Sequence, residues 1–181
     1  SCQRGGRTLP LLACLGDQQA AVIGLGSMAE GSCVANYGTG AFFLHNTGDK
    51  QHRVPGLLTS VGWKLKDEPP VFLQEGTVHA AGASFDWLRQ NLGLLSGNAG
   101  IDRACKASRQ RVFALQAIGG LGAPRWDYVT KSVFFGMTAQ TRSADLVRAV
   151  AEGVAFLISD IVGALRAGGL SPVDVKVSGG L

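Results

Sequence analysis

The chain has 181 residues, of which 46% are hydrophobic and 17% are charged. This length suits one domain with a buried core, and the composition excludes a disordered chain. There are 26 glycines but only 6 prolines, and no Gly-X-Y period, which excludes collagen. We expect the glycines to form tight turns or to let the backbone approach a ligand. The net charge of +4 comes from scattered basic residues, so no nucleic-acid partner is expected.

Cysteine and histidine spacing indicates neither a disulfide framework nor a metal site held by these residues. The four cysteines contain no CxxC pair and the three histidines no HExxH motif, so we expect reduced cysteines and a cytoplasmic protein. No window approaches the roughly 18 apolar residues of a membrane span. The apolar run at 9–15 follows Arg4 and Arg7, but it is short and contains Pro10, which favours a buried strand over a signal peptide.

Apolar periodicity predicts a mixed α/β fold in which strands come in pairs and long helices follow them. Strands are expected at 9–15, 33–37, 41–46, 57–64, 71–74, 112–118 and 173–177, with an extended stretch at 132–137. Helices are expected at 19–28, 78–94 and 143–167, and a loop with a short helix at 95–108. In the strand at 41–46 neighbouring side chains face opposite ways, so we expect Phe43 in the core and Phe42 on the other face.

Four glycine turns follow predicted strands, where backbone N–H groups can meet a phosphate. They are Gly16-Asp17, Gly38-Thr39-Gly40, Gly119-Gly120-Leu121-Gly122 and Ser178-Gly179-Gly180. None of them is a P-loop or a clean Gly-x-Gly-x-x-Gly, and ordinary tight turns remain an alternative for each. Asp17 has the position of a general base for a substrate hydroxyl, with a turn or helix-cap role as the alternative.

Taken in order, the motifs are more specific than any one turn. The series comprises Gly16-Asp17-Gln18-Gln19-Ala20-Ala21, Asn36-Tyr37-Gly38-Thr39-Gly40, Glu75-Gly76, Ala81-Gly82-Ala83-Ser84, Gly120-Leu121-Gly122-Ala123-Pro124-x-Trp126-Asp127 and Ser178-Gly179-Gly180. Over nearly its whole length the chain resembles the FGGY family of carbohydrate kinases, and within that family the glycerol kinases.

The resemblance implies an actin-like ATPase fold, related to ribonuclease H, with a mixed sheet and flanking helices. Residues 1–181 would form the second, C-terminal domain of a two-domain kinase, with the active site in the cleft between the domains. The chain starts without Met and stops just after a predicted strand and Gly179-Gly180, so we expect a fragment that is incomplete at its C-terminal end. The first domain, with the family's Mg²⁺-binding loop, would be absent, and the fragment alone inactive.

The resemblance also implies roles for single residues. Asp17 would be the catalytic base and a substrate contact, Gln18 a second substrate contact, and Phe42 a ring packed against the polyol. Thr39 would contact the phosphates of ATP, and Gly82 and Gly180 the nucleotide. ATP and Mg²⁺ are the implied cofactors. The implied partners are a polyol or sugar substrate and the missing N-terminal domain, and a homo-oligomer is left open.

Three residues depart from the pattern that the resemblance implies. Asp86 stands where glycerol kinases usually have a Gln that contacts the nucleotide, Gly119 replaces a Thr or Ser, and Arg125 replaces a Tyr. Two alternatives to a glycerol kinase therefore stay open. One is a kinase of another sugar, such as a pentulose, and the other is a degenerate, non-catalytic actin-like module.

Overall fold

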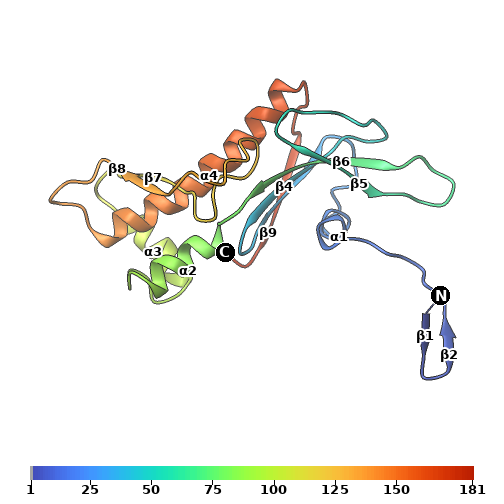
Figure 1. Ribbon diagram of the computed structural model, residues 1–181, viewed down its shortest axis with the longest axis horizontal. Coiled ribbons are helices and arrows are strands. Elements are labelled where there is room, and N and C mark those ends of the chain that lie inside the picture. The colour runs from blue at the N-terminus through green and yellow to red at the C-terminus, as the bar shows by residue number, and fades with distance from the viewer. Residues whose placement is uncertain (1) are drawn as a thin grey trace.

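The structure is a computed structural model that describes residues 2–181 (Figure 1). In chain order its elements are β1 (Cys2–Arg4), β2 (Arg7–Leu9), α1 (Asp17–Gly24), β3 (Ser32–Tyr37), β4 (Ala41–Asn46), β5 (Leu58–Trp63), β6 (Val71–Val78), α2 (Gly82–Gln90), α3 (Ala99–Ala107), β7 (Phe113–Leu115), β8 (Val133–Phe135), α4 (Ser143–Ala167) and β9 (Asp174–Gly179).

A five-stranded sheet with the order β5-β6-β4-β3-β9 forms the centre of the molecule. The pairs β5–β6, β6–β4 and β4–β3 are antiparallel, whereas β9 returns from the far end of the chain and pairs with β3 in parallel. The predicted mixed sheet with flanking helices is therefore confirmed. Two small antiparallel sheets, β1–β2 and β7–β8, lie outside it.

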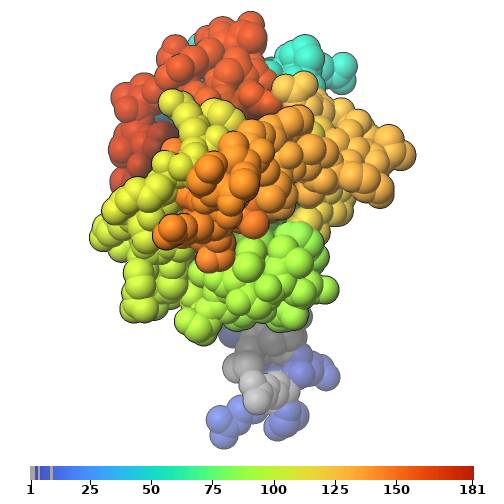
Figure 2. Space-filling model, turned by 90° about the vertical axis from the view of Figure 1, so that its left-hand side faces the viewer, coloured from blue at the N-terminus to red at the C-terminus, as the bar shows by residue number. Residues whose placement is uncertain are grey.

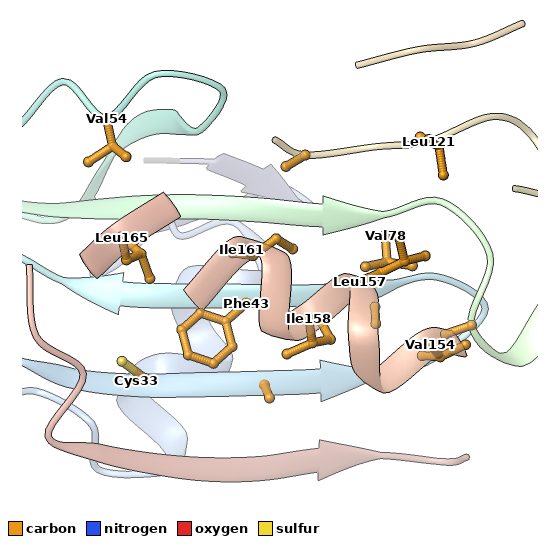
Figure 3. Packing of buried hydrophobic residues seen from close by; sticks show 14 of the residues in the cluster. Cys33, Phe43, Val54, Val78, Leu121, Val154, Leu157, Ile158, Ile161 and Leu165 are labelled. Atoms are coloured by element: carbon orange, nitrogen blue, oxygen red, sulfur yellow. The ribbon is translucent and has the colours of Figure 1, made fainter. Parts of the chain in front are cut away.

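Helices cover both faces of the sheet because its strands alternate apolar side chains between them. Cys33, Ala35 and Phe43 belong to the cluster that packs under α4 (Figure 3). Val34 and Leu44 belong to a separate cluster that includes Val22 of α1. Phe43 is 2% exposed and Phe42, its neighbour on the opposite face, is half-buried, so the expected alternation is confirmed.

Helix α4 has the bounds predicted for it, and its apolar face lies along the sheet (Figures 1 and 3). Its first turn is held by Asp145, the third residue of the helix. The Asp145 carboxylate accepts hydrogen bonds from the backbone N–H of Arg142 at 2.8 Å and of Gln110 at 2.9 Å. The N-terminal half of α4 packs with α2 and α3 into a second core cluster, and these helices form the end of the molecule shown in Figure 2.

The predictions at 9–15 and 78–94 differ most from the structure, and the helix predicted at 19–28 is observed at Asp17–Gly24. The predicted buried strand at 9–15 does not form, because β2 ends at Leu9 and residues 10–16 have no regular structure. Leu12 is 90% exposed, and no strand among residues 2–181 pairs with this segment. The predicted helix at 78–94 begins only at Gly82, because Val78 still pairs with Ala41 as the last residue of β6.

Within residues 2–181 no helix, α4 included, is long and apolar enough to cross a membrane.

Candidate active site

The β3–β4 hairpin turn carries Thr39 and lies against the first residue of α2. The backbone N–H of Gly82 donates to the Gly38 carbonyl at 2.9 Å, and the N–H groups of Ala81 and Ala83 each donate to the Thr39 carbonyl at 3.0 Å. A Cβ on Gly82 would lie 2.6 Å from the Gly38 oxygen, closer than real Cβ atoms approach. Glycine at 82 therefore allows the helix to start directly against the turn.

A cavity of about 230 Å³ opens at this contact between the hairpin turn and α2. Thr39, Gly82 and Gly180, which the sequence analysis names as ATP contacts, all line it. In Figure 1 the C-terminus correspondingly lies beside the start of α2. Three residues from distant parts of the chain thus meet in one place.

Two further polar side chains line the same cavity. The Asn98 amide donates to the Gly180 carbonyl at 3.1 Å, which links the start of α3 to the end of β9. Asp86, one turn along α2 from Gly82, accepts a hydrogen bond from the Arg89 guanidinium. The carboxylate and its arginine form an ion pair at the cavity wall, and each side chain is partly exposed.

A second cavity, of about 400 Å³, adjoins the first, since Asn98 lines both. Its other lining is mostly apolar and includes Phe85, Ile101 and Val154. A small polar chamber beside a larger apolar one suits a ligand with a charged end and a flat apolar end.

The remaining candidates lie on the face of the sheet that α1 covers. Asp17 is the first residue of α1 and is exposed, and its carboxylate accepts the backbone N–H of Gln18 at 2.8 Å. Gln18 is half-buried, and its Oε1 is a buried acceptor without a partner among residues 2–181. A buried unpaired acceptor is unfavourable in an empty site and favourable once a hydroxyl donates to it.

Gln19 anchors the start of α1 to the sheet. Its Nε2 donates to Glu75 at 3.3 Å, and the Ser60 hydroxyl donates to the same carboxylate oxygen. Phe42 stands on this face opposite Thr77 and Asn36, at the site end of β4. The structure therefore brings Thr39, Gly82 and Gly180 together at one cavity. Asp17 and Gln18 lie apart from them at the start of α1, and Phe42 lies on β4 near the hairpin turn that carries Thr39.

Mg²⁺ prefers carboxylate oxygens and water, together with substrate phosphates. The described part of the chain contains no group of three or more acidic, histidine or cysteine side chains that could hold a metal ion. Asp86 is the single carboxylate that lines the cavity, and Arg89 engages it. The residues present do not fit a protein-held Mg²⁺ site, and we assign no step to the ion.

Known proteins resemble this chain in both sequence and fold. The family model for the C-terminal domain of FGGY carbohydrate kinases matches residues 33–181, which is most of the chain. The chain belongs to the FGGY family of carbohydrate kinases.

Among FGGY relatives, glycerol kinase of Acinetobacter baylyi is 38% identical over 97% of this chain, and glycerol kinase of Halobacterium salinarum strain R1 is 37% identical over 97%. The structure of Plasmodium falciparum glycerol kinase with ADP superimposes with a TM-score of 0.85 at 33% identity over 95% of the chain. A xylulose kinase from Rhodospirillum rubrum, at 19% identity, shares the fold with a TM-score of 0.77. The predicted actin-like fold is thereby confirmed.

The chain spans about a third of the length of these FGGY relatives. It covers 36% of the Acinetobacter protein and 35% of the Plasmodium structure.

Sequence reasoning did not identify Asn98 or Leu181 as part of the cavity at the hairpin turn. Asn98 lies in a segment predicted only as a polar loop with a short helix. Its partner, the Gly180 carbonyl, is 82 residues away, and no local pattern marks such a contact. The hydrogen bond between Gln19 and Glu75 was only weakly indicated by the sequence. Both residues belong to motifs of the family resemblance, but a motif does not show which of its residues contact each other.

Proposed function

We propose that this chain is the second domain of a two-domain kinase that transfers the γ-phosphoryl group of ATP to a hydroxyl of glycerol or of a related polyol or sugar. The observation that supports it most is the shared cavity of Thr39, Gly82 and Gly180. These residues belong to three separate sequence motifs. Unrelated turns would not be expected to line one cavity together. Family membership and the length ratio to the relatives point the same way.

In this proposal the ATP phosphates lie against the hairpin turn and the start of α2. The Thr39 hydroxyl can donate to a phosphate oxygen, whereas the first N–H groups of α2 already donate to carbonyls of the hairpin turn. The apolar cavity beyond Asn98 takes the base. The two cavities together provide about the space that a nucleotide needs.

The hydroxyl acceptor lies between the start of α1 and Phe42. The Asp17 carboxylate accepts the proton of the attacking hydroxyl, whose oxygen then attacks the γ-phosphorus in line with the departing ADP oxygen. The buried Oε1 of Gln18 accepts a second substrate hydroxyl, and the Phe42 ring packs against the carbon chain.

The test is turnover by the full-length kinase that this proposal assigns to the chain. ADP release is measured with MgATP and a panel of glycerol, other polyols and ketoses, for the unchanged protein and for Asp17→Asn. We expect turnover with glycerol, and a fall of roughly 10²- to 10⁴-fold for Asp17→Asn, since the amide cannot take the proton.

Each other outcome has a distinct meaning. Turnover with a pentulose instead of glycerol would keep the Asp17 mechanism and replace the substrate. A near wild-type rate for Asp17→Asn would refute the assignment of the base. An absence of turnover with every acceptor, by a folded protein, would support the non-catalytic module. A cytoplasmic location and a homo-oligomer stay predictions.

A further inference from the structure

A cavity of about 420 Å³ lies between β7, the segment 121–130 and α4. Gly153 lets α4 lie directly against β7 there, because a Cβ at this position would come within 2.6 Å of the Ala114 carbonyl oxygen. Within the described chain this cavity shares no lining residue with the two cavities near the hairpin turn, and none of the six candidate residues lines it. It is therefore separate from the site proposed for ATP and its acceptor.

Large apolar side chains make up most of the cavity wall. Phe113, Phe135 and Phe156 line it and are partly exposed, whereas Leu121 and Leu157 line it and are buried. The aromatic rings therefore lie at the opening and the leucines at the bottom. Small-molecule sites are commonly apolar clefts of roughly 300–1,000 Å³ that contain a few polar groups. Aromatic and aliphatic walls of this kind fit a ligand with a flat apolar body.

Gln116 supplies a buried donor that nothing in the described chain uses. The residue lines the cavity and is 4% exposed. Its Oε1 accepts from the Ser132 hydroxyl at 3.3 Å, and the oxygen of that hydroxyl accepts the backbone N–H of Ala117 at 2.9 Å. The Ser132 proton thus fixes which way the amide faces. Nε2 is buried without a partner among residues 2–181, which is unfavourable until an acceptor reaches it.

The charges at the cavity favour a neutral acceptor over an anion. Arg125 and Asp160, the two ionisable residues of the lining in the described chain, pair with each other at 2.9 Å, so the cation is already compensated. The Thr130 hydroxyl donates to Asp127 at 2.5 Å and is engaged as well. A carboxylate placed against Nε2 would lose its hydration without gaining an unpaired cation, whereas a carbonyl loses much less.

We propose that this cavity binds a small neutral molecule with an apolar, ring-sized body and a carbonyl group, and that Nε2–H of Gln116 donates to the carbonyl oxygen. The inference goes beyond the proposed function, because neither a charged nucleotide nor a polyol has this chemistry. The phenylalanine rings at the opening contact the apolar body, and the amide at the wall selects the acceptor.

The experiment compares two molecules of the same shape, acetophenone and α-methylstyrene, which differ only in C=O against C=CH₂. Each is titrated into the ¹⁵N-labelled 181-residue chain, and binding is followed by NMR at the backbone N–H of Phe156 and at the side-chain amide of Gln116. We expect both molecules to shift the Phe156 signal. Acetophenone alone should move the Gln116 amide downfield, since it alone accepts a hydrogen bond.

Gln116→Leu removes the donor and keeps a side chain of similar size. One neutral hydrogen bond corresponds to a roughly 5- to 10-fold change in affinity, so acetophenone should bind that much more weakly. The affinity for α-methylstyrene should not fall. The matched control is Gln90→Leu, because Gln90 is an exposed glutamine of α2 outside the cavity, and it should leave both affinities unchanged.

A second variant tests the cavity wall without disturbing the core. Phe156 is partly exposed, so Phe156→Ala should stay folded and should weaken the binding of both molecules. Circular dichroism establishes that each variant is folded.

The other outcomes would each overturn the inference and leave the proposed kinase function untouched. They are no binding of either molecule to the folded chain, or equal loss of both in Gln116→Leu. Tighter binding of benzoate than of acetophenone would overturn the neutral ligand. Shifts at Phe156 and Gln116 that grow with the concentration of the chain alone would show that a second copy covers the cavity.

Discussion

At the scale of single residues, Gly82 is the position where the candidate site tolerates least change. A methyl group there would meet the Gly38 carbonyl oxygen at 2.6 Å, and a backbone atom cannot turn away as a side chain can. We expect Gly82→Ala to push α2 off the hairpin turn and to weaken ATP binding at least 10-fold, measured by calorimetry on the 181-residue chain.

Gly163→Ala is the matched control, because Gly163 lies inside α4 and a Cβ there would meet nothing within 4 Å. Alanine in a helix interior stabilises by about 0.5–1 kcal/mol relative to glycine. This variant should melt at a slightly higher temperature and bind ATP unchanged. Equal ATP affinity for Gly82→Ala would contradict the close contact as a requirement of the site.

A second prediction at the scale of single residues concerns Asp145. Its carboxylate is 2% exposed and accepts hydrogen bonds from two backbone N–H groups described above, from the Ser108 hydroxyl at 2.8 Å and from the Arg109 N–H at 2.7 Å. These bonds favour the ionised form and hold the pKa of Asp145 well below its usual range. The stabilisation is present above the pKa of the unfolded chain and is lost as pH falls toward the folded pKa.

We therefore expect Asp145→Asn to lower the melting temperature at pH 7, with the difference from the unchanged protein shrinking progressively below about pH 4. Thermal melts followed by circular dichroism across pH 2–7 measure it. Asp102→Asn is the control, since that carboxylate is exposed and pairs only with exposed Lys106. A pH-independent difference for Asp145→Asn would contradict the hydrogen-bond explanation.

At the scale of elements, β9 connects the two groups of candidate residues. Its C-terminal end leads to Gly180 in the cavity, and Lys176 in its middle donates to the carbonyls of Leu25 at 2.8 Å and Gly26 at 3.1 Å, just after the end of α1. A cation at a helix C-terminus interacts favourably with the helix dipole. One side chain thus holds the helix that begins with Asp17 against the strand that leads to the cavity at Gly180.

We expect Lys176→Met to loosen α1 while the sheet stays folded. The loss of about 1 kcal/mol corresponds to roughly 5-fold faster amide hydrogen exchange in α1, with little change in β3 and β4. Exchange measured by mass spectrometry tests it, with exposed Lys66→Met as the control. Unchanged exchange in α1 would show that Lys176 does not hold the helix.

The sequence predicts some elements better than others for physical reasons. Helix α4 is predicted to the residue because its apolar period runs through 25 residues and a glycine pair follows it. The run at 9–15 is predicted wrongly because its burial depends on a neighbour, and no pattern within a short apolar run shows whether one exists. The start of α2 is placed too early because Val78 fits the apolar face of a helix and a strand equally well.

The residues of the candidate site divide in the same way, into those marked by a local sequence motif and those that depend on the fold. Thr39, Gly82 and Gly180 could be named because each lies in a glycine motif, where the chain itself carries the signal. The free acceptor of Gln18, the Asn98–Gly180 bond and the Arg89 contact of Asp86 could not. They depend on distances between side chains, which the fold alone determines.

At the scale of the whole molecule, β9 is one of the two edges of the five-stranded sheet within the described chain, and its side chains on the α4 face are apolar. Val177 is 65% exposed and Val175 is 45% exposed. Exposed edge strands with apolar side chains favour association with other chains. We expect the 181-residue chain to self-associate, with a mass above 18.8 kDa in light scattering at high concentration.

Replacing Val175 and Val177 together by Thr keeps the strand propensity and makes the edge polar. This variant should return the chain toward the monomer. The matched control replaces Val129, which is 81% exposed but lies in a turn, by Thr. A monomeric unchanged chain, or association that survives the double replacement, would contradict the role of this edge.

The parallel pairing of β3 with β9 has a further consequence for the order in which the molecule folds. Every pair in that ladder, from Ser32 with Asp174 to Tyr37 with Gly179, joins residues about 140 positions apart. Closing so long a loop costs entropy before any contact compensates, which makes such a step slow. During synthesis β3 can pair with β4 at once, but its other side waits until residues 174–179 have left the ribosome. The hairpin that carries Thr39 thus forms before the cavity beside it, which also needs Gly180.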